Sequence, residues 1–346
     1  MGTKRLLLYA LIGGLMVWGA TGCDDDPAAP APDNSLTSCF NCHGDTPGST
    51  TTSILAISTE YNLSKHATGV TFERKSGSCA GCHSYEGFVT RVQTGAFPTG
   101  TLGHSSPIDC WTCHAPHTTG TFGLRTSTAV TFIDGSGTFD YGPANLCANC
   151  HQSRVASPAV PAAATDSITI NNRWGPHHGT QAQMLAGKSG FFTTTNPALN
   201  SPHTTLAEFV AEGCVHCHMS TPPSGGLAGG HSWNMIWDDH GTPTEFVEAC
   251  TACHTSAENF DVNGAVTEID ALIATTQARL LGAGLIDAEN LAVPGKRSQA
   301  QVKAIFNYLL VVEDRSHGVH NANYARALLN SALEFVPAPP PKVAMN

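Results

Sequence analysis

The stretch Gly103–His117, GHSSPIDCWTCHAPH, contains the run CWTCH at residues 110–114. A C-x-x-C-H run is the attachment pattern of c-type haem: its two thiols bond to the porphyrin, and its His ligates the iron. His117 lies three residues beyond the run. One iron cannot take both imidazoles, because its axial ligands occupy opposite faces of a flat macrocycle. His117 is therefore expected to reach a second haem.

The C-x-x-C-H pattern occurs six times and uses twelve of the thirteen Cys. The predicted attachment thiols are Cys39, Cys42, Cys79, Cys82, Cys110, Cys113, Cys147, Cys150, Cys214, Cys217, Cys250 and Cys253. The predicted proximal ligands are His43, His83, His114, His151, His218 and His254. Structural zinc sites also use C-x-x-C pairs but do not require a His directly after each one, and a thioredoxin-like dithiol would be a single site. The pattern therefore predicts six covalently attached haem c groups.

The composition suits a chain whose core is supplied partly by cofactors. Gly (34) and Pro (21) are abundant, and a chain rich in Gly, Thr, Ser and Pro is short of aliphatic residues for a conventional core. The predicted fold is mainly α with extensive loops and minor β, packed around six covalent haems and ending in C-terminal helices. Attachment and folding are expected to be coupled, so the haem-free chain should be largely disordered.

The N-terminus predicts export. Residues 1–22 have a short basic start and an apolar stretch too short for a typical membrane span, which is typical of a signal peptide. Small residues directly before Cys23 predict a lipoprotein signal with Cys23 as the lipidation site; an ordinary signal peptide with a free thiol is the alternative. The Pro/Ala/Asp-rich residues 23–38 would be a tether. The predicted location is the cell envelope, at the periplasmic face or cell surface, with the lipid holding the chain to a membrane.

The rest of the chain is predicted to form two modules, a four-haem module over residues 39–154 and a two-haem module with C-terminal helices over 155–336, followed by a disordered tail at 337–346. Strand-like alternation predicts a hairpin arm at 121–133. Pro116 is expected to interrupt any helix and make a rigid turn. Apolar periodicity predicts helices at 203–213, 268–282, 298–313 and 321–336, the third with Ser298 as N-cap.

Each iron needs a sixth ligand or an open position. Few Met lie in the haem region, whereas the chain has 17 His, so mostly bis-His ligation with low potentials is expected. The candidate distal ligands are His66, His117, His177, His203, His231 and His320. The reserves are His178, His240, His317 and, as the strongest substitute, His104. A lone His is more often a surface residue or a propionate partner, but six haems reverse that expectation.

Residues 39–336 resemble the multihaem c-type cytochromes of bacterial respiration, through the six C-x-x-C-H runs and strings such as CWTCHAPH. The string DRSHGVHNANYARALLNSAL at 314–333 resembles the C-terminal helical region of ammonia-forming nitrite reductases and related octahaem enzymes. That resemblance implies that His320 ligates a haem. The catalytic haem of those reductases is commonly bound through C-x-x-C-K, which this chain lacks, so the resemblance implies shared haem packing and does not carry over the activity.

Two functions follow from these patterns. The first is an envelope-anchored electron-transfer protein in anaerobic respiration or extracellular electron transfer, and no catalytic residue is assigned in it. Its partners would be other redox proteins (cytochromes or quinol-linked donors) and terminal acceptors, with an oligomer or filament as a variant. The alternative is a reductase of nitrite, hydroxylamine or sulfite at one five-coordinate haem, with Arg125, Arg154 or Arg173 above it. The net charge of −10 argues against a nucleic-acid partner.

Overall fold

The computed structural model describes residues 54–69, 71–119, 121–154, 163, 165–194, 200–221 and 227–338. The chain divides between Leu55 and Ala56, so nearly all of the described structure belongs to the second unit. The first C-x-x-C-H run, Cys23, the predicted signal peptide and the predicted tether lie outside the described residues, as does the predicted tail from residue 339 onward. The predicted module boundary after residue 154 falls inside the second unit.

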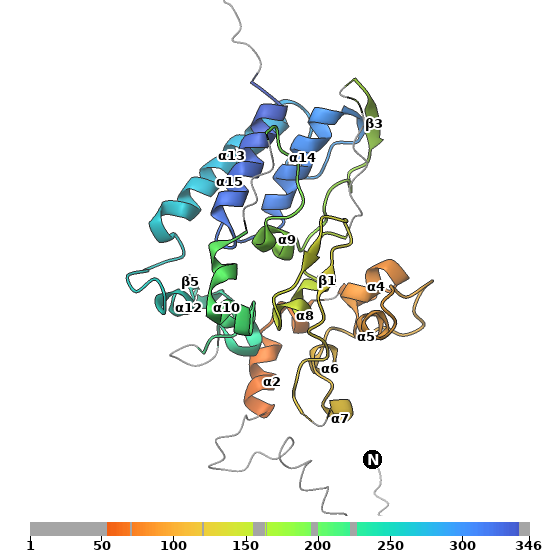
Figure 1. Cartoon of the computed structure of the whole chain (residues 1–346), viewed down its shortest axis with the longest axis vertical. Coiled ribbons are helices and arrows are strands. Elements are labelled where there is room, and N and C mark those ends of the chain that lie inside the picture. The colour runs from red at the N-terminus through yellow and green to blue at the C-terminus, as the bar shows by residue number, and fades with distance from the viewer. Residues whose placement is uncertain are drawn as a thin grey trace, which may run out of the picture. The chain divides into compact units, whose positions relative to one another are not determined.

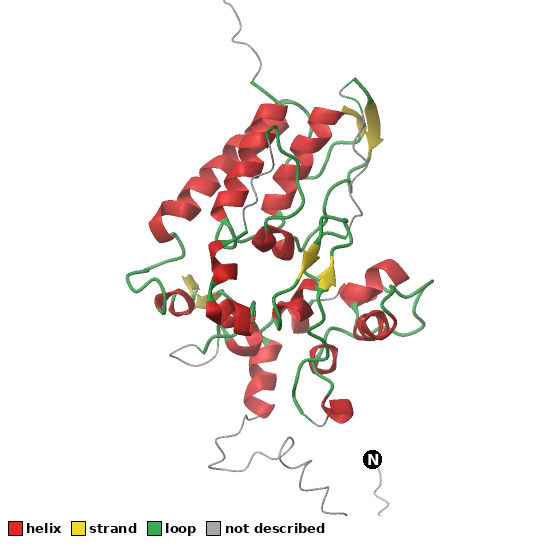
Figure 2. Ribbon diagram, in the orientation of Figure 1, coloured by secondary structure: helices red, strands yellow, loops and turns green. Residues whose placement is uncertain are grey.

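Helices and loops make up most of the described chain (Figures 1 and 2), and the predicted mainly α fold class is confirmed. Up to residue 260 the helical elements are short. They are α2 (Ile54–Asn62), α3 (Lys65–Thr68), η1 (Thr71–Glu73), α4 (Gly77–His83), α5 (Tyr85–Thr94), α6 (Cys110–Cys113), α7 (Pro116–Thr119), α8 (Ala144–Ala148), α9 (Gln181–Ala186), η2 (Pro202–Thr205), α10 (Ala207–Glu212), α11 (Val215–His218), η3 (Gly230–Ser232) and α12 (Glu248–Thr251).

The longest helices come last, after η4 (Val262–Gly264). They are α13 (Ala265–Gly282), α14 (Gln299–Val312) and α15 (Ala322–Phe335), close to the ranges that the periodicity predicts. Ser298 is the N-cap of α14: its Oγ accepts from the Gln301 backbone N–H, and the Gln301 side chain accepts from the Ser298 N–H. This reciprocal capping box satisfies two N–H groups at the helix start. Asn321 caps α15 in a similar way, accepting from the Tyr324 N–H.

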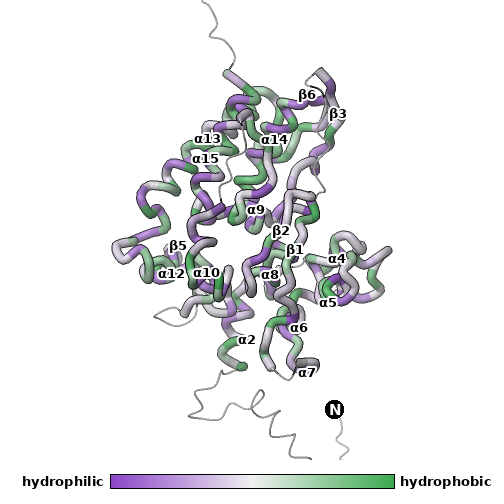
Figure 3. The backbone as a smooth tube through the Cα atoms, in the orientation of Figure 1, coloured by the Kyte–Doolittle hydropathy of each residue, from purple (hydrophilic) through white to green (hydrophobic). Residues whose placement is uncertain are grey.

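These three helices pack around a conventional apolar core. Figure 1 shows α13, α14 and α15 close together, and Figure 3 shows hydrophobic residues recurring along α14 and α15. Ile305, Leu310, Leu328 and Leu329 are fully buried in this core. A second, smaller cluster forms around Phe132, Phe139 and Phe209 and includes residues of α8 and α9. The C-terminal helices therefore bury the larger share of apolar side chains.

Three two-stranded antiparallel sheets complete the described fold. Strand β1 (Val130–Thr131) pairs with β2 (Thr138–Phe139), and β4 (Ile236–Asp239) pairs with β5 (Thr242–Glu245). Strand β3 (Ser167–Ile170) pairs with β6 (Gly295–Ser298), with Ser167 opposite Ser298. The β3–β6 pair fixes a segment that follows the fourth motif beside the start of α14.

The hairpin prediction for residues 121–133 is wrong for most of its length. Strand β1 starts only at Val130, and the hairpin runs from there to Phe139. The earlier residues pack on the third motif instead: the Arg125 backbone N–H donates to Cys113 O (2.7 Å), and the Arg125 guanidinium donates to His114 O (3.0 Å). These contacts compete with strand pairing, so the first arm is short.

Pro116 begins a helical turn rather than only breaking one. Helix α6 ends at Cys113, and α7 starts at Pro116, where a residue without an N–H is tolerated. Among the described residues, no helix has the length and the apolar character that a membrane crossing requires.

Candidate haem-binding sites

Each described C-x-x-C-H run forms or adjoins one helical turn. The backbone N–H of the motif His donates to the carbonyl of the first Cys in the third, fourth, fifth and sixth runs, over 2.9, 2.9, 3.1 and 2.8 Å. Four-residue spacing closes a helical turn, so the two thiols and the imidazole of a run are held on one short, rigid segment. At the third run, Asp109 and Thr112 add a capping box that fixes the turn's start.

The structure places a second imidazole opposite each described motif His. Among the described residues, the five pairs are His66 with His151 (ring centroids 6.1 Å apart), His83 with His177 (6.3 Å), His114 with His231 (6.4 Å), His203 with His254 (6.4 Å) and His218 with His320 (6.2 Å). In each pair one residue belongs to a C-x-x-C-H run and the other is a predicted distal ligand. The two members of each pair come from segments far apart in the sequence.

The separation of these rings fits two ligands on one metal ion. An imidazole nitrogen binds a metal at about 2 Å, and the ring centre lies about 1.1 Å further, so two rings on opposite sides of an ion have centres about 6.2 Å apart. The observed separations run from 6.1 to 6.4 Å. Two opposed imidazoles leave the equatorial positions of an octahedral ion open, and the four nitrogens of a porphyrin fill such a plane. The donor set therefore fits a haem at each pair, with the Cys of the run beside it.

In several of these His, the ring nitrogen Nδ1 already has a hydrogen-bond partner within the protein. Nδ1 of His114 lies 2.7 Å from Phe122 O, and Nδ1 of His218 lies 3.3 Å from Trp233 O. A carbonyl oxygen only accepts, so in both rings Nδ1 carries the proton and Nε2 has the free lone pair. Such contacts fix the tautomer and the ring orientation of a metal ligand.

Burial favours the neutral, ligating form of most of these imidazoles. Burial lowers the pKa of His66, His177 and His218 to about 4 in each case. Burial also lowers the pKa of His83, His151, His203 and His231. At neutral pH these side chains are uncharged, as metal ligation requires. His320 differs: burial lowers its pKa, but the charge and hydrogen bond of Asp314 outweigh that effect and raise the pKa overall.

The remaining candidates lie elsewhere. His117 is on α7, with its ring 4.9 Å from the Trp111 ring; His43, the proximal residue of the first run, is outside the described residues. The reserve His104 lies beside Glu86 (3.5 Å), and its side chain is 82 % exposed. The other reserves face carboxylates: His178 contacts Glu313, His240 lies 3.9 Å from Asp239, and His317 contacts Asp270.

The glycines before His231 let the backbone lie close to neighbouring protein atoms. A Cβ on Gly229 would lie 2.0 Å from Ser220 O, and one on Gly230 would lie 2.4 Å from Glu60 Oε2. Both glycines have positive φ, which side-chain-bearing residues rarely adopt. The Glu60 carboxylate accepts from the His231 backbone N–H at 2.9 Å. These contacts hold the His231 loop against α2 and aim its ring at His114.

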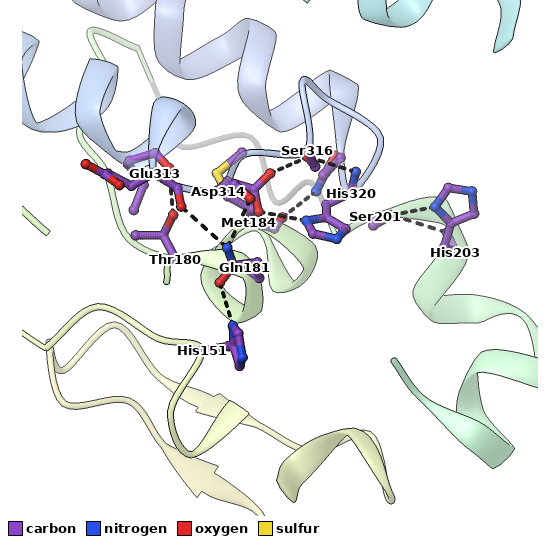
Figure 4. A network of polar contacts seen from close by, with 12 residues as sticks. His151, Thr180, Gln181, Met184, Ser201, His203, Glu313, Asp314, Ser316 and His320 are labelled. Atoms are coloured by element: carbon purple, nitrogen blue, oxygen red, sulfur yellow. Dashed lines mark hydrogen bonds and ion pairs between the residues drawn. The ribbon is translucent and has the colours of Figure 1, made fainter. Parts of the chain in front are cut away.

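A polar network that the sequence did not predict joins two of the sites (Figure 4). Gln181 accepts from Nδ1 of His151 through Oε1 (3.1 Å), and its Nε2 donates to Asp314 O (3.0 Å). The Asp314 carboxylate in turn lies 2.7 Å from Nδ1 of His320. Gln181 and Asp314 belong to no motif, and their role depends on packing between α9 and the end of α14, so the sequence contains no local signal for them.

Neighbouring sites also lie close together. The Cys150 thiol lowers the pKa of Cys82, and the Cys214 thiol lowers the pKa of Cys147, so the fourth run lies near both the second and the fifth. Arg91 contacts the Cys82 sulfur at 3.3 Å.

An aromatic side chain links two further sites. The Trp233 ring lies 5.0 Å from the His66 ring and 5.6 Å from the His231 ring. His66 belongs to the pair of the fourth run and His231 to the pair of the third. The second, third and fifth candidate sites therefore each neighbour the fourth.

Comparison with known proteins identifies relatives that bind haem. No family model matches the chain. The C-type polyheme cytochrome OmcC of Geobacter sulfurreducens is 25 % identical over 284 residues, which cover 66 % of this chain and 36 % of OmcC. The chain thus spans about a third of the length of this curated relative.

Two solved structures are similar. The outer cell wall cytochrome OcwA matches with a TM-score of 0.51 and 22 % identity, over 81 % of this chain and 50 % of OcwA. An undecaheme cytochrome from the S-layer of Carboxydothermus ferrireducens matches with a TM-score of 0.45 and 19 % identity, over 83 % of this chain and 41 % of that protein. The relatives are multihaem cytochromes, and the chain has the mainly α fold of this class.

Proposed function

We propose that the chain is a c-type cytochrome with six covalently attached haems that relays electrons between redox partners. The observation that carries the proposal is the set of five imidazole pairs, each with a separation that fits one iron. Bound haem supplies a one-electron ferric/ferrous couple. The Cys of each run would hold it covalently, and the paired His would close both axial positions, which favours outer-sphere transfer over substrate binding.

Two further ligands are proposed from the sequence alone. His43 would be the proximal ligand of the first run, and His117 would be a distal ligand of a haem other than that of the third run. His117 lies on α7, the helical turn that follows the third run, and His114 of that run pairs with His231 instead. Residues 103–117 would then join two centres.

The contacts between sites support a relay. Thiols of the second and fifth runs lie near enough to thiols of the fourth run to shift their pKa values, and Trp233 lies near ligands of both the third and fourth sites. Groups attached at such runs would lie close together, which suits transfer from one centre to the next. The chain's residues would tune each centre through ligand identity, burial and hydrogen bonding.

The cell envelope is the proposed location, with Cys23 as the lipidated anchor and other redox proteins as donor and acceptor. The small residues before Cys23 support the anchor. OcwA is an outer cell wall cytochrome, which supports an exported location for this chain. Replacing Cys23 with Ala should release the protein from membranes in cell fractionation; a variant that stays membrane-bound would remove the lipid anchor from the proposal.

One experiment distinguishes electron transfer from catalysis. The fully reduced protein should be reoxidised rapidly by a soluble ferric complex, which needs no open coordination position. It should not turn over nitrite, hydroxylamine or sulfite with an artificial donor in steady state. Sustained turnover of any of the three would support the alternative, a reductase with one five-coordinate iron, and would overturn the pure relay.

A further inference from the structure

A buried carboxylate contacts Nδ1 of one of the candidate iron ligands. The Asp314 side chain is 2 % exposed, and its Oδ1 lies 2.7 Å from Nδ1 of His320, whose own side chain is 19 % exposed. Ser316 donates its hydroxyl to the other carboxylate oxygen. Within the described residues, the ion pairs of Asp314 comprise this contact with His320 alone. The negative charge therefore faces the fifth site, where His320 pairs with His218.

The third and fourth sites have weaker or neutral partners in this position. Nδ1 of His114 faces a backbone carbonyl, and Nδ1 of His151 faces the neutral Gln181 amide. Within the fifth site itself, Nδ1 of His218 also faces a backbone carbonyl. Glu60 is the closest parallel, but its carboxylate lies 3.9 Å from Nδ1 of His231 and its side chain is 30 % exposed. Water screens an exposed charge far more than a buried one.

The negative charge of Asp314 would stabilise the ferric and ferrous states of a haem at this site to different extents. One electron added to a ferric haem removes one positive charge from the iron, and a nearby carboxylate stabilises the more positive state. A carboxylate that accepts a hydrogen bond from an imidazole also raises the basicity of the ligating nitrogen. Both effects favour the oxidised form and lower the reduction potential.

We propose that Asp314 is a positioning residue that sets the fifth site, held by His218 and His320, to the lowest reduction potential among the described sites. The inference rests on the proposed function, because it assumes an iron between these two imidazoles. The fifth run neighbours the fourth at Cys214 and Cys147. In a relay, electron transfer from the fourth site to a fifth site of lower potential would be energetically uphill, so the fifth site would limit transfer in that direction.

Spectroelectrochemical titration of the haem-loaded protein tests the proposal. Asp314→Asn keeps an oxygen that accepts from Nδ1 of His320 but removes the charge. One of the six potentials, that of the fifth site, should rise, with about a tenfold change in its reduction equilibrium, equivalent to about 59 mV for one electron. Asp314→Glu should restore most of the original value, which a merely structural role would not do. Glu60→Gln is the matched control and should shift any potential by less than about threefold in the same equilibrium.

The shifted centre is identified with a second variant. His320→Ala should convert one haem from low to high spin, and the wave that changes should be the one that Asp314→Asn shifts. In the double variant, Asp314→Asn should then have little further effect on the other five waves. Six unchanged potentials in Asp314→Asn, with six low-spin haems, would overturn the inference and leave the relay intact. A high-spin haem in the unmodified protein would instead count against the proposed function.

Discussion

The region of the C-x-x-C-H runs and the C-terminal helices are built on different principles. In the first, helices of three to ten residues and the loops between them carry the motif His and most of their partners. In the second, α13, α14 and α15 have 18, 14 and 14 residues and share an apolar core. Short helices are marginal by themselves, so the first region depends on what its Cys and His bind. The second region is stabilised by its own side chains and supplies His320 and Asp314 to the first.

Removing the haems should have the largest effect and tests this contrast between the two regions. A chain produced without haem attachment should lose ordered structure in residues 71–260 while α13 to α15 retain part of theirs, because their core is apolar. Hydrogen exchange followed by mass spectrometry should show slow amides only in the C-terminal helices, and the haem-loaded chain is the reference. Equal protection in both regions of the haem-free chain would erase the contrast.

Cavity formation in the C-terminal core should have the next largest effect. Leu310 is fully buried, whereas Leu281 is 39 % exposed. Leu310→Ala should lower the free energy of unfolding by about 2–5 kcal/mol, since it removes packed atoms and leaves a cavity. Leu281→Ala, the matched control, should cost about 1 kcal/mol or less. Guanidinium denaturation of the haem-loaded protein, followed by far-ultraviolet circular dichroism, measures both; similar losses would mean that this core contributes little.

Replacing a distal ligand should affect only the haem that it binds. His177 lies opposite His83, and its neighbour His178 contacts Glu313 at the surface. His177→Ala should convert one haem to high spin without loss of covalent attachment, because the Cys of the run still hold it. His178→Ala should leave the spin state unchanged. Electron paramagnetic resonance of the oxidised proteins distinguishes them, and the same spectrum for both variants would exclude His177 as a ligand.

The smallest effect compares two capping boxes. Ser298→Ala, at the start of α14, should cost about 1 kcal/mol of stability, as for other N-caps. Asp109→Ala, at the start of α6, should cost less in the haem-loaded protein, because thioether bonds would hold that turn in place. Thermal denaturation of the two variants gives the comparison, and a larger loss for Asp109→Ala would show that α6 depends on its cap.

The sequence predicts different features with different success. Helices α13 to α15 follow from periodicity and from caps such as Ser298, because these signals are local. The C-x-x-C-H runs are equally local. The pairing of His66 with His151, by contrast, depends on contacts between distant segments, so the sequence could nominate candidates but could not match them. Gln181 and Asp314 escaped prediction because only the packing of α9 against the end of α14 brings them to the ligands.

The spin state of the oxidised protein tests the central claim most directly. Quantitative electron paramagnetic resonance, combined with an intact mass that counts the attached groups, gives the number of low-spin and high-spin haems per chain. The account predicts six attached haems, all low-spin with two imidazole ligands. A high-spin haem in the unmodified protein, or fewer than six attached groups, would contradict it.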